Sequence, residues 1–102
     1  MNSFEQTSLF ARWLSGLKDS KGKARILARI KAAEQDNFGD CESVGQGVWE
    51  MRVHCGPGYR VYMTRRAGLI YLLLIAGDKS TQKRDIKHAI QLAKDLCERS
   101  PS

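Results

Sequence analysis

The chain has 102 residues, of which 42% are hydrophobic, and its 17 Lys and Arg against 11 Asp and Glu give a formal net charge of +6. This size predicts a single globular domain over residues 1–102, with 99–102 as a flexible tail, and the longest apolar run, residues 69–76, is too short to span a membrane. We therefore expect a cytoplasmic protein that does not act in a membrane, and whose partner is a polyanion such as nucleic acid, or an acidic protein.

The first third of the chain carries one short strand pattern and two helical patterns. Residues 2–6 predict an edge strand. A short helix follows, with Thr7 or Ser8 as its N-cap and apolar residues at helical spacing; these are Phe10, Trp13, Leu14 and Leu17. A second helix is predicted over about 21–35, and the two should form a hairpin.

Three strand-like runs, residues 48–54, 59–65 and 69–76, follow the polar cluster at 36–40. The third run is apolar on both faces, which is typical of an interior strand. A last helix follows Gly77, with Ser80 or Thr81 as its N-cap. The predicted class is α+β, with a small antiparallel-rich sheet, an N-terminal helix hairpin and a C-terminal helix.

The Gly56-Pro57-Gly58 turn predicts a β-hairpin between the first two runs. A turn centred on Pro57 pairs His54 with Arg60 and Arg52 with Tyr62. Side chains alternate along a strand, so one hairpin face is core and the other, which carries Glu50, Arg52, His54, Arg60 and Tyr62, serves chemistry or meets solvent.

Three cysteines lie far apart without a disulfide or zinc-ligand spacing, namely Cys41, Cys55 and Cys97. We expect free thiols, no structural metal and no cofactor.

Three sequence segments, in this order of elements, carry a family resemblance: NFGD at 37–40, GPGYRVY at 56–62 and GDKSTQ at 77–82. The chain resembles the killer-protein branch of the RelE/ParE toxin superfamily, close to the HigB-type and phage-derived toxins. The resemblance implies a RelE-like fold and a toxin of a type II toxin-antitoxin module that cleaves mRNA in the ribosomal A site. It also implies a cognate antitoxin, of helix-turn-helix type in this branch, with the free toxin a monomer and the complex a heterotetramer.

Cleavage of RNA through its own 2′-hydroxyl requires removal of that proton, stabilisation of charge on the phosphorus and a proton for the departing 5′-oxygen, and it needs no metal. The residue types suited to these tasks are gathered on the polar hairpin face, just after the third strand and at the start of the last helix. The candidate catalytic residues are Glu50, Arg52, His54, Arg60, Lys79 and Asp85.

The resemblance assigns roles to several of these candidates. Arg52 and Arg60 fall where RelE-like toxins bind the scissile phosphate, and Lys79 falls near another basic position; Arg60 is the leading candidate. RelE itself has a lysine at the position of Glu50 and a tyrosine near that of Asp85. HigB-type members use histidine, aspartate and tyrosine more freely.

The proton carrier is therefore left open. His54 suits that role because imidazole titrates near neutrality, and its alternative is an exposed cross-strand partner of Arg60. Glu50 or Asp85 can act as a base or orient a neighbour.

A further set of residues suits contacts with RNA outside the chemistry. Tyr62 can stack on a base or simply pack, and the cations can hold phosphates or form a solvated face. The candidate RNA-binding residues are Lys23, Arg25, Arg29, Tyr62, Lys83 and Arg84.

Two other functions remain open. From the ParE side, the chain can be a non-enzymatic poison that binds DNA gyrase, or it can be a basic binding module without activity. A nuclease needs the cationic candidates to converge on one site, whereas a gyrase poison does not.

Overall fold

The computed structural model describes the backbone of residues 1–99 and the side chains of residues 1–96. Over that part of the chain, one five-stranded sheet, three α-helices and a short 3-10 helix follow one another as β1 (Ser3–Gln6), α1 (Ser8–Gly16), α2 (Ser20–Glu34), β2 (Cys41–Gly45), β3 (Val48–Val53), β4 (Tyr59–Ala67), β5 (Ile70–Asp78), η1 (Lys79–Thr81) and α3 (Gln82–Arg99). The predicted α+β class is confirmed. None of the described helices is long and apolar enough to cross a membrane. The predicted tail lies outside the described residues apart from Arg99, which ends α3.

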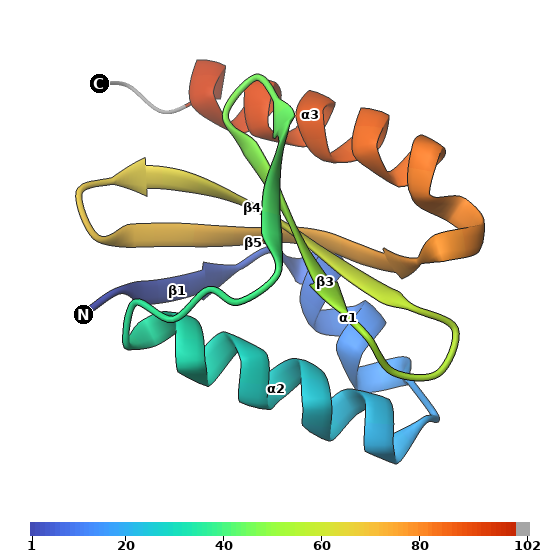
Figure 1. Ribbon diagram of the computed structural model, residues 1–102. Coiled ribbons are helices and arrows are strands. Elements are labelled where there is room, and N and C mark those ends of the chain that lie inside the picture. Colours follow the sequence, from blue (N-terminus) through green and yellow to red (C-terminus); the bar gives the residue numbers. More distant parts are fainter. Residues whose placement is uncertain (100–102) are drawn as a thin grey trace.

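The sheet has the strand order β1-β5-β4-β3-β2, and only the β1–β5 pair is parallel. Residues 2–6 thus contribute an edge strand, and the apolar third run is an interior strand, both as predicted. Figure 1 shows α1 and α2 on one side of the sheet and α3 on the other. The sheet is therefore the middle layer of three.

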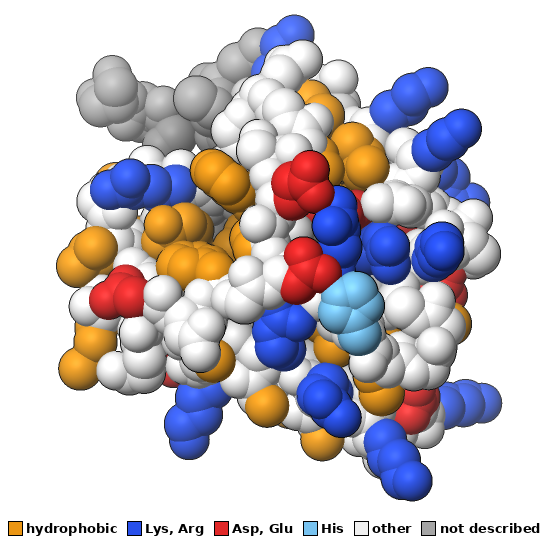
Figure 2. Space-filling model, viewed as in Figure 1, with side chains coloured by type: hydrophobic (Ala, Val, Ile, Leu, Met, Phe, Trp, Pro, Cys, Tyr) orange, Lys and Arg blue, Asp and Glu red, His pale blue; other side chains and the backbone are white. Residues whose placement is uncertain are grey.

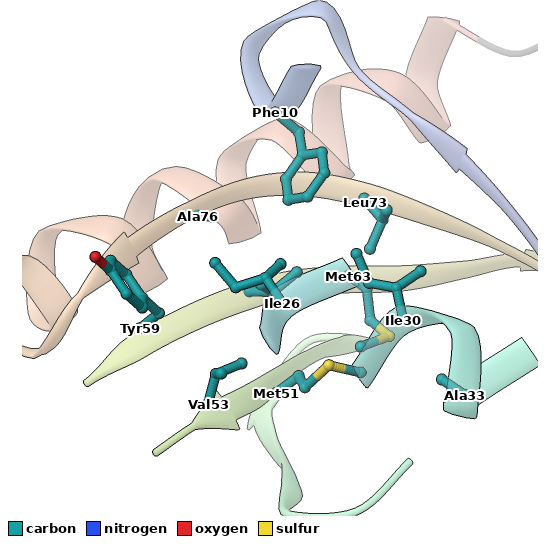
Figure 3. Packing of buried hydrophobic residues seen from close by; sticks show 11 residues of the cluster. Phe10, Ile26, Ile30, Ala33, Met51, Val53, Tyr59, Met63, Leu73 and Ala76 are labelled. Carbon is teal, nitrogen blue, oxygen red and sulfur yellow. The ribbon is translucent and has the colours of Figure 1, made fainter. Parts of the chain in front are cut away.

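Two apolar clusters hold these layers together, because alternate residues of each strand point to opposite faces. Figure 3 shows the cluster beneath α1 and α2, which includes Phe10, Ile26, Met51 and Leu73. The second cluster, on the α3 face, contains Val48, Tyr62, Leu72, Leu74, Ile75 and Ala89. The hairpin face that was predicted to serve chemistry or meet solvent is partly covered by α3, which buries its central residues Glu50 and Tyr62, so the solvent alternative was wrong for these two.

The helix hairpin is fixed by polar contacts at its N-caps. Thr7 caps α1, as predicted, by accepting a 3.0 Å hydrogen bond from the Phe10 amide. Asp19 caps α2 and also accepts a 2.7 Å hydrogen bond from the Tyr59 hydroxyl. A Cβ on Gly22 would lie 2.5 Å from the Tyr59 ring, so glycine is needed where α2 passes this side chain.

The hairpin register differs from the predicted one by two residues. Arg52 pairs with Arg60, and Val53 pairs with Tyr59, so His54 lies beyond the end of β3. This pairing is centred on Gly56 rather than Pro57. The Gly58 amide closes the turn with a 3.1 Å hydrogen bond to the Cys55 carbonyl. Because the displacement is an even number of residues, the predicted division of side chains between the faces remains correct.

Two local features were not predicted. Strand β2 pairs with β3 through a turn at Gly45-Gln46-Gly47, where all three residues have positive φ. The C-terminal helix is preceded by η1, whose N-cap is Asp78; its side chain accepts a 2.8 Å hydrogen bond from the Ser80 amide. Asp78 therefore ends β5 and caps η1, while the predicted N-cap Thr81 directly precedes Gln82, the first residue of α3.

Candidate functional site

Glu50 is a buried carboxylate on the α3 face of β3, and its side chain is 1% exposed. Its Oε2 accepts a 2.9 Å hydrogen bond from the Tyr62 hydroxyl and another of 2.9 Å from Nε2 of Gln82. Burial and then the hydrogen bond to Glu50 raise the pKa of Tyr62 far above its usual value. Glu50 therefore joins β3, β4 and the start of α3 through one carboxylate.

The same carboxylate holds the two arginines that pair across β3 and β4. Nε of Arg52 donates a 3.1 Å hydrogen bond to Oε1 of Glu50, and Nε of Arg60 lies 3.8 Å from Oε2. Nη1 of Arg60 donates a 2.9 Å hydrogen bond to the Gly58 carbonyl. The Arg52 side chain is 30% exposed and the Arg60 side chain only 12%. Arg52 therefore reaches the surface, whereas Arg60 is largely buried and its Nε is held near Glu50 by charge, without a hydrogen-bond partner among the described residues.

Lys79 joins this pair from the end of β5. A Cβ placed on Gly58 would lie 3.2 Å from Nη1 of Arg60 and 3.7 Å from Cβ of Lys79, so the two residues flank Gly58. Lys79 also lines an open depression at the start of α3, together with Ser80, Thr81, Gln82, Lys83 and Arg84. Figure 2 shows Lys and Arg side chains gathered with acidic ones on the right half of one face of the molecule.

His54 is presented at the surface by the turn that follows β3. Its side chain is 73% exposed, and Nε2 lies 2.6 Å from Oδ2 of Asp40. Oδ1 of the same carboxylate lies 3.6 Å from Nη1 of Arg52. Nη2 of Arg52 contacts Glu42. His54 is thus linked to the arginine pair through Asp40, and the predicted alternative, a cross-strand pairing with Arg60, was wrong.

Arg29 has a structural position that the sequence analysis did not foresee. Its guanidinium, on α2, donates hydrogen bonds to the carbonyl of Arg52 and, at 2.9 and 3.3 Å, to those of Phe38 and Asp40. These contacts tie the loop before β2 to the end of β3. The Arg29 guanidinium, which was predicted to bind RNA, is therefore already engaged in these hydrogen bonds.

Two other candidates lie inside the structure. Tyr62 is fully buried beneath α3, so the predicted role as a base-stacking platform was wrong and the packing alternative holds. Asp85 is 8% exposed and accepts a 2.5 Å hydrogen bond from the Thr81 hydroxyl. A Cβ on Gly77 would lie 2.1 Å from Oδ2 of Asp85, so this carboxylate packs on the backbone of β5. Its position fits a structural link better than an accessible base.

The remaining predicted cations divide between the two helix layers. Lys83 and Arg84 are exposed on α3, in the depression that Lys79 lines. Lys23 and Arg25 lie on α2, which covers the opposite face of the sheet. The structure therefore brings Arg52, Arg60, Lys79, Lys83 and Arg84 toward one end of the sheet, and Lys23 and Arg25 are not part of that group.

Within the described part of the chain, no three His, Cys, Asp or Glu side chains come together in a way that could hold a metal ion. Cys41 and Cys55 are free thiols, and burial raises the pKa of Cys41. The side chain of Cys97 lies outside the described residues.

Sequence comparison relates the chain to phage-derived proteins. A family model described as "Phage derived protein Gp49-like" matches residues 12–98. A protein of Haemophilus influenzae, described as uncharacterized, is 50% identical over 90 residues, which cover 88% of this chain and 91% of that protein. The family match includes every candidate catalytic residue.

Proposed function

We propose that this chain, which belongs to the Gp49-like family of phage-derived proteins, is the toxin of a type II toxin-antitoxin module and a RelE/ParE-type, HigB-like endoribonuclease. It cleaves mRNA on the ribosome and so inhibits translation. Its partners are the ribosome, mRNA and a cognate helix-turn-helix antitoxin. The free toxin is a monomer in the cytoplasm, and the toxin-antitoxin complex is a heterotetramer.

The observation that carries this proposal is the convergence of Arg52, Arg60 and Lys79 at one end of the sheet, with the two arginines held by Glu50. A planar guanidinium can donate two hydrogen bonds to a phosphate at once, and a held side chain loses less entropy when it does so. A gyrase poison has no need for this convergence.

The reaction begins when a base takes the proton of the 2′-hydroxyl. The 2′-oxygen forms a bond to phosphorus, the bond between phosphorus and the 5′-oxygen breaks, and the departing oxygen takes a proton from water. The products are a 2′,3′-cyclic phosphate and a 5′-hydroxyl end. Arg60 and Arg52 stabilise the charge that develops on the phosphate oxygens, with Lys79 beside them.

His54 is the best-placed base because it is exposed and is linked to Arg52 through Asp40. Lys83 and Arg84, in the adjacent depression, bind phosphates on either side of the cleaved bond. Glu50 orients the arginines and does not exchange protons with the substrate, because its carboxylate is enclosed by Tyr62, Gln82 and the arginines.

The test is induced expression of the wild type and Arg60→Ala in a bacterial host, with mRNA 5′-ends and ribosome positions mapped soon after induction. We expect cuts within translated frames for the wild type and none for the variant. Arg25→Ala, which removes an exposed cation from the opposite layer, is the matched control and should still cut. Growth arrest with intact mRNA and inhibited supercoiling would instead identify gyrase as the target, and harmless expression of the folded wild type would identify an inactive module.

A further inference from the structure

Asp40 is the one acidic residue that contacts both His54 and Arg52 in the described structure. Its Oδ2 lies 2.6 Å from Nε2 of His54, and its Oδ1 lies 3.6 Å from Nη1 of Arg52. Asp40 ends the NFGD segment at 37–40 and lies in the loop before β2, and the sequence analysis assigned it no role. The contact engages one ring nitrogen of an otherwise exposed histidine and leaves the other, Nδ1, directed away from the carboxylate.

The backbone around Asp40 is held by contacts that do not involve the Asp40 side chain. The Asp40 carbonyl accepts a 2.9 Å hydrogen bond from the Arg52 amide and one of 3.3 Å from the Arg29 guanidinium. Gly39 has a φ of +62°, a conformation that favours glycine, and the Arg29 guanidinium packs against it. The loop is thus anchored to both α2 and β3, and the carboxylate is presented to His54 from a held position.

We infer that Asp40 is a positioning residue that keeps the Nε2–H tautomer of His54, so that Nδ1 carries the lone pair that accepts the 2′-hydroxyl proton. An ionised carboxylate only accepts hydrogen bonds, so a neutral His54 must carry its proton on Nε2 to make this contact. Which ring nitrogen is protonated is set by the hydrogen bond that the other makes. The role of His54 as the base rests on the proposed function. The claim that Asp40 sets the tautomer of His54 does not.

The charges around the pair favour an ionised Asp40. The hydrogen bond from His54 is the main cause that lowers the pKa of Asp40, and the charges of Arg52 and Arg29 lower it further. Arg52 is itself shared with Glu42 and Glu50, so it neutralises Asp40 only in part. A carboxylate that stays charged near neutral pH can hold the imidazole and stabilise the imidazolium that forms when the ring takes a proton.

The first test is the tautomer of His54, read from ring nitrogen chemical shifts at a pH where the ring is neutral. The chain has two histidines, so His54→Gln assigns the signal. We expect the Nε2–H form in the wild type and a shift toward the Nδ1–H form in Asp40→Asn, whose amide can donate to Nε2. Glu42→Gln removes another acidic partner of Arg52 without touching His54, and it should keep the wild-type tautomer. An unchanged tautomer in Asp40→Asn would overturn the inference.

The second test is cleavage of ribosome-bound mRNA by the same variants. Asp40→Asn should lower kcat by about ten- to a hundredfold with little change in KM, and combining it with His54→Gln should add no further loss, because both remove the same base. A shifted tautomer with undiminished kcat would overturn the catalytic role of Asp40 while leaving the nuclease intact. A wild type that does not cleave would overturn the proposed function, and the tautomer would still decide whether Asp40 positions His54.

Discussion

Nε of Arg60 lies 3.8 Å from Oε2 of Glu50, and the carboxylate is 1% exposed. A carboxylate that has left water must be compensated by charge or by hydrogen bonds, and here two arginines, a tyrosine and a glutamine do so. The arginines that the proposed reaction needs are therefore also part of the packing between the sheet and α3. A substitution should therefore change activity without changing stability only if the Glu50 carboxylate keeps its hydrogen bonds and compensating charge.

Replacing Glu50 with alanine should lower the free energy of unfolding by about 3 kcal/mol, because the Tyr62 hydroxyl, the Gln82 amide and the arginines lose a shared buried partner. Urea denaturation at constant m-value measures this loss. Glu42→Ala is the matched control, since Glu42 contacts Arg52 from the surface, and it should change stability little. Similar losses in the free energy of unfolding for the two variants would contradict the role of Glu50 as the shared buried partner of these side chains.

Sequence patterns predicted the layers of this fold better than its site. The apolar periodicities of α1, α2, β5 and α3 indicate faces that must be buried, and those elements form as expected. Strand β2 was missed because its sequence, CESVG, has little apolar character and is defined by its pairing with β3.

The site depends on contacts between distant segments, which local patterns do not encode. Arg52, Arg60 and Lys79 could be grouped because strand alternation and strand ends are readable from sequence. The two-residue error in register concealed the pairing of Arg52 with Arg60, and nothing local indicates that Asp40 meets His54 or that Arg29 binds three carbonyls. The sequence alone does not distinguish Tyr62 from an exposed aromatic residue, because its burial depends on the position of α3.

Gly77→Ala should destabilise the protein by about 2 kcal/mol, because the new methyl group would lie 2.1 Å from Oδ2 of Asp85. The same substitution in an Asp85→Ala background should cost clearly less, since the overlapping atom is gone. A double-mutant cycle measured by urea denaturation tests this coupling. Strictly additive losses would show that Asp85 does not pack on β5 as described.

Arg29→Ala should loosen the loop before β2, because three carbonyl groups lose one shared donor, and we expect a loss of about 1–3 kcal/mol in the free energy of unfolding. Faster amide exchange at the start of β2 is the direct measurement. Arg25→Ala removes a neighbouring exposed cation of the same helix and serves as the control. Equal exchange in the two variants would contradict the anchoring role of Arg29.

The protein should lose stability between about pH 10 and pH 12. The hydrogen bond to Asp19, and then burial, raise the pKa of Tyr59 to about 12, above its unfolded value near 10. A group whose pKa is raised on folding contributes stability that is complete below the unfolded pKa and is lost as the pH rises through the folded pKa. Tyr62, whose pKa is also raised, adds to the loss.

Unfolding measured against pH, together with tyrosinate absorbance, tests this dependence. Tyr59→Phe should show a shallower alkaline loss than the wild type. The chain has three tyrosines, and titration of all three near pH 10 in the folded wild type would contradict the description of Tyr59 and Tyr62.

The most direct test of the central claim is the rate at which purified protein cleaves mRNA on a programmed ribosome, compared between the wild type and Arg60→Gln. Arg25→Gln is the charge-matched control, and the folded state of each variant is verified by its unfolding curve. We predict a 2′,3′-cyclic phosphate end for the wild type and the control, with a rate at least about a hundredfold lower for Arg60→Gln. Equal rates for a folded Arg60→Gln would contradict the account, because the cation held by Glu50 would then have no part in the reaction.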